Sequence, residues 1–487
     1  AAFNAIKKAS ELIDMSKHKG EHPRMGATDV CPIIPISNVS IEECVEYSKI
    51  LAKKVGDKLK IPIFLYEESS TSADRKNLAN IRKGEYEGMK DKLLSPIWKP
   101  DFGPNILNEK AGVTAIGVRN FLIAYNINLN TKDKKMATDI ALDVREAGRA
   151  KRDSSGKILR YKDGKMKKKP GILKYTKAVG WFIDEYKKAQ VSINLTNFTK
   201  TPIHVVFEEV RNQARRRGLR VTGSEIVGLV PKKSLIDAGI YYLKKQKKTT
   251  SVPDSEIIDI AIESLGLNDI SNFNQEKSII ENRILESGNR LKDLSLQDFI
   301  NEVSIDSPAP GGGSVSALTG ALSSSLISMV SNLSYNKKGY DKFNLKFESI
   351  GCEAQNIKRE LIHLIDKDTD AFNMIMKAFR LPKKTDKERA IRQESIEKAT
   401  KNAIETPLEV MKLCLRLLKL SKEISKIGNQ NSLSDAGVAS EAAFSSLNGA
   451  YMNVLINLKD IGEHSYKKKI IKKTNSLVRE SKKEIEI

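Results

Sequence analysis

The sequence predicts a multidomain protein in which an α/β half, made of two sheet-plus-helix subdomains, precedes an all-helical domain. Three observations lead to this prediction. The chain has 487 residues, which is too many for one compact core. Up to about Leu267, short β-rich runs alternate with amphipathic stretches. Beyond Leu294 this alternation is lost, and the remaining pattern is helical throughout.

The elements of the first half follow from hydrophobic periodicity. The strand candidates are CPIIPI (31–36), IPIFLY (61–66), FLIAYNINL (121–129), VSINL (191–195) and IVGLV (226–230). The helix candidates are residues 1–20, 42–59, 134–150 and 204–218. The elements before and after Phe121 could each make a small sheet with helices on one face, so we expect the half to divide there. The expected domains are 1–121, 122–274 and 295–487, with a polar, charged linker at 275–294.

Composition excludes several classes of protein. Hydrophobic residues make up 40% and charged residues 30%, which excludes global disorder. The four cysteines are far apart, with no C-x-x-C pair and no nearby histidine cluster, so we expect neither a structural zinc site nor disulfides. A reducing, cytoplasmic location and no metal are the expectation. The uncharged stretch 307–336 contains three consecutive glycines and eight later serines, which predicts a loop and a packed helix rather than a membrane span.

The chain is strongly basic. It has 83 Lys and Arg residues against 61 Asp and Glu, a net charge of +22, which fits a polyanionic partner such as nucleic acid, an acidic membrane or a multiply carboxylated ligand. Basic residues concentrate at 157–177, with nine basic residues and one acidic, and at 467–473. We favour solvated surface over a nucleic-acid site for both runs.

His22 is the candidate proton acceptor of the first half. It lies in GEHPRMG, between a predicted helix and a predicted strand, where Pro23 favours an extended conformation. A histidine on such a stiff loop can take a proton near neutral pH. Arg24 beside it could hold a substrate carboxylate in bidentate fashion. A structural, hydrogen-bonding role for the histidine remains the alternative.

Asp368 is the candidate acid or base of the helical half. Apolar residues recur at intervals of three and four between Ile350 and Phe379, and Asp368 occupies a position in that stripe, whereas Asp366 and Asp370 are expected to be solvated. Burial would raise the pKa of this carboxyl unless a cation or donors stabilise its charge. A register-fixing buried polar group is the alternative.

The glycine run GGGS at Gly311 opens the helix predicted in the uncharged stretch. Its backbone N–H groups are unobstructed by side chains and suit a carboxylate or phosphate at the positive end of the helix dipole. A plain helix entry with Ser314 as the cap is the alternative.

Several motifs together resemble the bifunctional glutamate formiminotransferase / formimidoyltetrahydrofolate cyclodeaminase family. They are GEHPRMGATDVCPIIPI, the DFGP loop at Asp101, AGVTAIGVRNFLIAYNINL, SPAPGGGSVSA, DKDTDAF with RLPK at Arg380, and GAYMNVLINLKDI at Gly449. They cover nearly the whole chain and occur in the family's order, so the resemblance is specific.

The resemblance implies two successive activities. The transferase half, with a folate groove between its subdomains, would move a formimino group from N-formimino-L-glutamate to N5 of tetrahydrofolate. The helical half would then close the ring to 5,10-methenyltetrahydrofolate and expel ammonia, the closing steps of histidine breakdown. His22 falls on the family's transferase histidine and Asp368 on the cyclodeaminase carboxylate. The positions implied for folate binding are Gly103, Pro104, Asn105, Ile106, Leu107, Asn108, Glu109, Lys110, Ala111, Gly112, Gly311, Gly312 and Gly313.

The resemblance also implies tetrahydrofolate as co-substrate, with a polyglutamate tail that matches the basic charge, and a homo-oligomer of dimers, with a ring of four dimers in relatives. It implies no specific nucleic acid and no metal. Relatives begin with a further strand and helix that add an acidic residue to the transferase site, so we expect an exposed sheet edge and an incomplete site here.

Two alternatives remain open. One is a chain that keeps only cyclodeaminase or methenyltetrahydrofolate cyclohydrolase activity, with the first half as a scaffold. The other is a basic RNA- or cytoskeleton-binding protein that uses the two lysine-rich runs.

Overall fold

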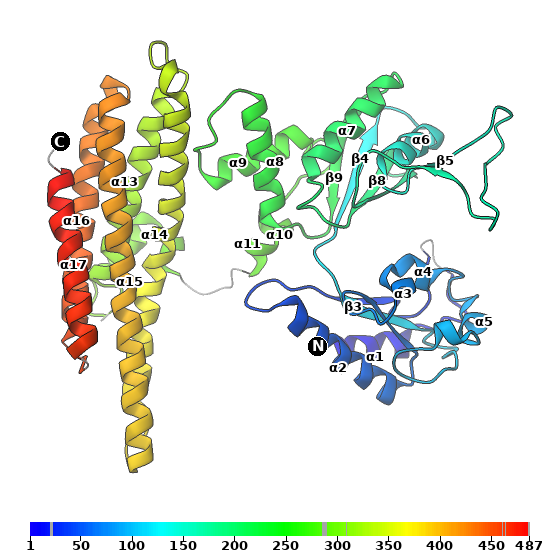
Figure 1. Ribbon diagram of the computed structural model, residues 1–487, viewed down its shortest axis with the longest axis horizontal. Coiled ribbons are helices and arrows are strands. Elements are labelled where there is room, and N and C mark those ends of the chain that lie inside the picture. The colour runs from blue at the N-terminus through cyan, green and yellow to red at the C-terminus, as the bar shows by residue number, and fades with distance from the viewer. Residues whose placement is uncertain (20–22, 285–289, 308, 460, 463, 486–487) are drawn as a thin grey trace. The chain divides into compact units, whose positions relative to one another are not determined.

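The computed structural model describes residues 1–19, 23–284, 290–307, 309–459, 461–462 and 464–485. The chain divides into two compact units, Ala1–Val221 and Thr222–Ile487. The first unit contains two sheets with their helices, and the second is built almost entirely from helices, as the sequence predicts (Figure 1).

The first sheet is parallel, with the strand order β1–β3–β2. Its strands are β1 (Val30–Ile33), β2 (Ile63–Glu67) and β3 (Thr114–Val118). On one face, residues such as Ile63 and Ile116 pack with helices α1 (Ala2–Leu12) and α2 (Ile41–Leu59). On the other face, residues such as Phe64 pack with α4 (Leu78–Arg82) and α5 (Met89–Leu93), close to the short α3 (Ala73–Lys76). Both faces are therefore covered, and the prediction of helices on one face was wrong for this sheet.

The second sheet has three antiparallel strands in the first unit, in the order β7–β8–β4. These are β4 (Ile123–Leu129), β7 (Thr176–Ile183) and β8 (Lys188–Leu195), and helices α6 (Lys134–Val144) and α7 (Ile203–Arg216) pack against them. A Cβ atom at Gly180 would lie 2.2 Å from the backbone nitrogen of Thr138, so α6 packs directly on β7 only because residue 180 is glycine. The strands β5 (Arg149–Ala150) and β6 (Lys168–Lys169) form a separate ribbon.

Several predicted boundaries are corrected by the structure. The helix predicted over 134–150 ends at Val144, because the chain turns at Gly148, where φ is +62°, and enters β5. The strand predicted at 226–230 is β9 (Val221–Val227), which ends before Gly228, where φ is +87°. Strands β3 and β7 were not among the candidates; each contains an internal glycine, Gly117 or Gly180, which weakens the strand signal.

In the second unit, strand β9 is followed by the helical pair α8 (Lys232–Lys245) and α9 (Asp254–Leu265). The bundle that follows consists of α12 (Leu296–Ser304), α13 (Gly312–Ser334), α14 (Asn344–Phe379), α15 (Asp386–Ile427), α16 (Leu433–Leu458) and α17 (His464–Ile485). The predicted linker 275–294 contains the short helices α10 (Gln275–Ser278) and α11 (Ile280–Ile284), with Ile279 and Ile280 buried, so its described part is not a free connection. The predicted domain boundaries themselves stay predictions.

The turn between α8 and α9 is fixed to the bundle by a polar network. The backbone nitrogen of Thr250 donates to Oε1 of Glu348 at 3.0 Å. The main-chain oxygen of Ser251 accepts from Ser328 at 2.9 Å and from Asn332 at 3.0 Å. Because these groups are buried or half-buried, their mutual satisfaction holds α8 and α9 against α13 and α14.

Helix α13 is the central helix of the bundle. It packs against α14, α15 and α16, and small residues allow close contact: a Cβ atom at Gly320 would lie 3.0 Å from Sγ of Cys414. By length and composition α13 could cross a membrane, but 61% of its most apolar window is buried inside the protein. This burial is that of a core helix, which agrees with the loop and packed helix predicted for 307–336.

Candidate active site

Asp368 faces the first turn of α13, so the structure brings together the two features that the sequence singles out in the helical half. The carboxylate lies against Gly313: a Cβ atom there would be 2.1 Å from Oδ1. Ser314 Oγ donates to the main-chain oxygen of Ile365 at 2.9 Å and lies 3.3 Å from Oδ2 of Asp368. A side chain at residue 313 would displace the carboxylate, which explains the need for glycine.

Burial raises the pKa of Asp368, and hydrogen bonds from the side chain and backbone of Ser314 partly oppose this effect. The carboxyl is half-buried, so it is partly desolvated and yet accessible from one side. A carboxyl with a raised pKa can hold a proton closer to neutral pH and exchange it with a ligand, as a general acid or base does.

The neighbours of Asp368 differ in environment. Asp370 is exposed, as predicted. Asp366 was expected to be solvated, and this was wrong: it is half-buried, its Oδ2 is buried without a hydrogen bond among the described residues, and its Oδ1 lies 3.4 Å from the backbone nitrogen of Lys292. The end of the predicted linker, at Lys292, lies over this side of α14, a long-range contact that no local pattern reveals.

The remaining glycines of the run have different surroundings. Gly311 is the N-cap of α13, and Gly312 is exposed. A Cβ atom at Gly312 would lie 3.3 Å from Nδ2 of Asn453 on α16. Asn453 is thus a polar side chain at the site that the residue-level reasoning did not select, although it lies within a quoted motif.

In the first unit, the loop 103–112 runs beside the segment that follows His22. The backbone nitrogen of Ala27 donates to the oxygen of Ala111 at 2.9 Å, and Gly26 and Gly112 form a β-bridge. A Cβ atom at Gly26 would lie 2.0 Å from the oxygen of Val113, so the two segments approach as closely as backbone permits. His22 lies outside the described residues, but Pro23 and Arg24, which follow it, belong to this segment.

The loop itself is held by its own polar groups. Asn108 accepts from the backbone nitrogens of Ala111, through Oδ1 at 2.9 Å, and of Gly112, through its main-chain oxygen at 2.7 Å. Tyr86 Oη donates to the main-chain oxygen of Glu109 at 2.6 Å, a contact that sequence reasoning missed because it joins distant segments. The loop leaves the side chain of Ile106 75% exposed, so an apolar surface is available to a ligand.

Arg24 is already paired with carboxylates of the chain. Its guanidinium forms a bidentate contact with Glu87, at 2.6 and 2.9 Å, and a second contact with Glu85 at 3.2 Å. The hydrogen bond to Arg24 lowers the pKa of Glu87 to about 2. A substrate carboxylate would have to displace Glu87, so the predicted role of Arg24 stays a prediction.

The described residues contain no cluster of three or more His, Cys, Asp or Glu side chains placed to hold a metal ion.

Comparisons with known proteins bear on all parts of the chain. Three family models match: the N-terminal subdomain of the formiminotransferase domain over residues 1–119, the formiminotransferase domain over 124–285, and formiminotransferase-cyclodeaminase over 295–476. A formimidoyltransferase-cyclodeaminase of Mus musculus is 40% identical over 483 residues, covering 99% of this chain and 86% of the relative.

Two further relatives correspond to parts of the chain. A glutamate formimidoyltransferase of Streptococcus pyogenes is 46% identical over 244 residues, which is 50% of this chain and 74% of the relative. A methenyltetrahydrofolate cyclohydrolase of Methylorubrum extorquens is 33% identical over 187 residues, which is 38% of this chain and 90% of the relative.

Proposed function

Because the chain belongs to the formimidoyltransferase-cyclodeaminase family, we infer that it is a bifunctional folate enzyme. Its first half transfers the formimino group of N-formimino-L-glutamate to tetrahydrofolate and releases glutamate. Its helical half cyclises 5-formiminotetrahydrofolate to 5,10-methenyltetrahydrofolate and releases ammonia. The observation that carries this conclusion is the match over both halves in one chain, joined to the placement of Asp368 against Gly313.

For the second reaction, we propose Asp368 as the group that moves the proton. In the bound amidinium form of the substrate, N10 attacks the formimino carbon and gives up its proton to the carboxylate. This attack closes the ring. The carboxyl then returns the proton to the departing nitrogen, which leaves as ammonia, and the C–N double bond of the methenyl bridge forms. The raised pKa of Asp368 supports both steps, since the group must be able to accept and to release the same proton.

For the first reaction, we propose His22 as the base that takes the N5 proton while the nitrogen attacks the amidine carbon. The proton then passes to the leaving nitrogen of glutamate. The contact of segment 23–27 with loop 103–112 supports this role, because it holds the histidine's neighbours beside the predicted folate loop. Exposed Ile106 in that loop offers an apolar contact for the pterin or its benzoyl group.

Finer features of the function are proposals of the same kind. We propose that the folate carries a polyglutamate tail, which the net charge of +22 supports, and that neither reaction uses a metal. Cytoplasmic location is supported by the four free cysteines. The reactions would then belong to histidine degradation.

A homo-oligomer is supported by an apolar stripe on α13. Val315, Leu322 and Met329 recur every seven residues and expose 37%, 57% and 37% of their surface. Such a stripe on a central helix is typical of a surface that a second helix covers. We propose that a second copy of the chain covers it, and Leu322→Lys should then shift the protein to a smaller species in size-exclusion chromatography; unchanged elution would contradict this.

The activity test is absorbance of methenyl-folate after mixing the protein with formiminoglutamate and tetrahydrofolate. The parent should produce the signal, His22→Ala should abolish both products, and Asp368→Ala should accumulate 5-formiminotetrahydrofolate without methenyl-folate. If supplied 5-formiminotetrahydrofolate is cyclised by the parent while formiminoglutamate is never consumed, only the cyclodeaminase activity is present. A signal unchanged by either replacement would remove the site assignments.

A further inference from the structure

Residues 149–169 form a small three-lobed ribbon. Neither of the two proposed reactions assigns a role to it. Strands β5 and β6 pair at its base. Two more hairpins are closed by bridges between Arg152 and Ile158 and between Arg160 and Met166. Within each of these hairpins the arginine donates to a glycine carbonyl four residues later, at 2.6 and 2.8 Å, so the same turn is built twice.

The three lobes meet at a ring of backbone hydrogen bonds. The nitrogen of Lys151 donates to the oxygen of Lys167 at 2.8 Å, that of Lys167 to Leu159 at 2.8 Å, and that of Leu159 back to Lys151 at 2.9 Å. Nearly all side chains of the ribbon are exposed, so this closed ring, and not a hydrophobic core, sets its shape. The ribbon is therefore an ordered platform for its charges.

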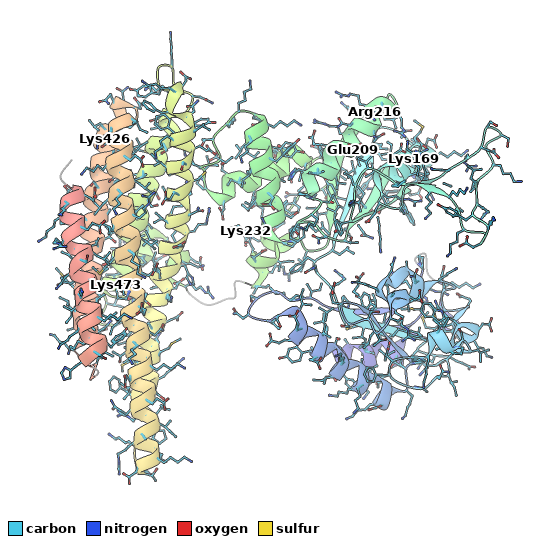
Figure 2. All side chains as sticks on the ribbon, in the orientation of Figure 1. Lys169, Glu209, Arg216, Lys232, Lys426 and Lys473 are labelled. Atoms are coloured by element: carbon cyan, nitrogen blue, oxygen red, sulfur yellow. The ribbon has the colours of Figure 1, made fainter. Side chains whose placement is uncertain are left out.

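A pocket of about 590 Å³ lies where the ribbon joins α6. Six of the lining side chains are basic and four are apolar, and none is acidic. Figure 2 labels Lys169 at this place. This volume is typical of binding pockets, and the positive charge of the lining side chains favours an anionic occupant.

The basic groups of the pocket fall into two sets. The arginines are engaged with their own chain: Arg145 Nε donates to the oxygen of Gly148 at 2.9 Å, and Arg149 pairs with Asp139 and Asp143 at 2.9 and 2.7 Å. In contrast, Lys151, Lys168 and Lys169 form no ion pair within the part of the chain that the structure describes. These three lysines are thus available to a ligand.

We propose that this pocket and ribbon bind an extended, glutamate-rich segment of a partner protein. Lysine ammonium groups are point charges that suit single carboxylates, whereas the guanidinium of Arg149, which could clamp a phosphate, is already paired with Asp139 and Asp143. The apolar part of the lining, including Leu159 and Met166, can contact the methylene groups of glutamate side chains. Further basic residues lie beyond the pocket on the two hairpins of the ribbon. The occupant is therefore an extended polypeptide segment and not a compact anion.

A nucleic acid fits the same surface less well. The pocket contains no aromatic side chain on which a base could stack. The nearby ring of Tyr161 is covered by Nζ of Lys167, 5.3 Å from its centroid. Single-stranded RNA is therefore the competitor against which the proposal is tested.

The test is fluorescence anisotropy of a labelled peptide of alternating glutamate and leucine blocks, titrated with the full chain. The pocket variant carries Lys151→Gln, Lys168→Gln and Lys169→Gln. The control carries Lys468→Gln, Lys469→Gln and Lys472→Gln on α17, which removes the same charge from the other unit. We expect the pocket variant to raise the Kd at least about tenfold and the control less than about twofold, with the melting temperature unchanged in both.

Three outcomes would overturn the proposal: no change in the pocket variant, equal losses in both variants, or tighter pocket-dependent binding of an RNA oligonucleotide of equal charge. Pocket-dependent binding of an oligo-γ-glutamyl folate that excludes the peptide would also overturn it, because the site would then serve the substrate's tail. None of these measurements depends on the two enzymatic activities.

Discussion

Asp368→Asn tests the central assignment, because it keeps the shape of the carboxyl and removes its proton exchange. Asparagine still offers an acceptor to Ser314, whose hydroxyl lies 3.3 Å from Oδ2, and adds no atom toward Gly313. Loss of a general acid or base costs roughly 10²- to 10⁴-fold in rate. We expect kcat for cyclisation of 5-formiminotetrahydrofolate to fall within that range while formimino transfer continues.

The same variant should change stability with pH in a defined direction. Burial raises the pKa of Asp368 above its ordinary value of 3.8. The protonated group favours folding, so its contribution is fully present below pH 3.8 and is lost as the pH rises through the raised pKa. The charged carboxylate of the parent opposes folding at high pH, so the asparagine variant should gain stability relative to the parent as the pH rises through the raised pKa.

The assay is differential scanning calorimetry between pH 5 and 8, together with the rate of methenyl-folate formation. Each 1 kcal/mol of stability corresponds to roughly 2–4 °C in Tm for a domain of about 200 residues, so the Tm difference between variant and parent is the quantity to follow. Asp370→Asn is the matched control, because it removes a carboxylate two residues away that is exposed. A variant that is less stable than the parent at pH 8, or one that cyclises at the parent's rate, would refute the reasoning.

Three further predictions concern the same structure. Gly313→Ala should lose cyclodeaminase activity about 100-fold or more by displacing the carboxylate of Asp368, the proposed proton-transfer group. Gly312→Ala, whose Cβ would meet only a side chain at 3.3 Å, should retain most of the activity, and kcat of the two variants tests the difference. Glu87→Gln should release Arg24 and lower the KM for formiminoglutamate by about two- to fivefold if Arg24 binds the substrate carboxylate, and an unchanged KM would exclude that role. Ser251→Ala removes the hydroxyl that donates to Oδ1 of Asn332, so it should leave the bundle folded and increase hydrogen exchange in α8 and α9; exchange as slow as in the parent would show that this hydroxyl does not anchor the pair.

The sequence predicts most of the fold because its signals are local. The capping box in which Ser40 and Glu43 bond each other's backbone starts α2 where the pattern places a helix. The stripe between Ile350 and Phe379 likewise predicts α14 and the half-buried position of Asp368. Where local signals compete, as at Gly148 and Gly228, the predicted boundaries shift by several residues.

The candidate site is predictable only in part. The residue pattern selects Asp368 and the glycine run separately. Asp368 is a carboxylate within an apolar stripe, and the run places three consecutive glycines at the start of a helix. Their contact, the burial of Asp366 and the pairing of Arg24 with Glu87 join segments far apart in the chain. No periodicity within one segment encodes such pairs.

The sequence by itself determined the order of the domains, the family, and which residues are chemically unusual, because periodicity, composition and motifs are properties of neighbouring residues. Only the tertiary structure decided that the carboxyl of Asp368 touches a glycine, that Arg24 is already paired, and that Lys151, Lys168 and Lys169 line one pocket. Those outcomes depend on which distant groups meet and on how much water they lose, and packing alone sets both.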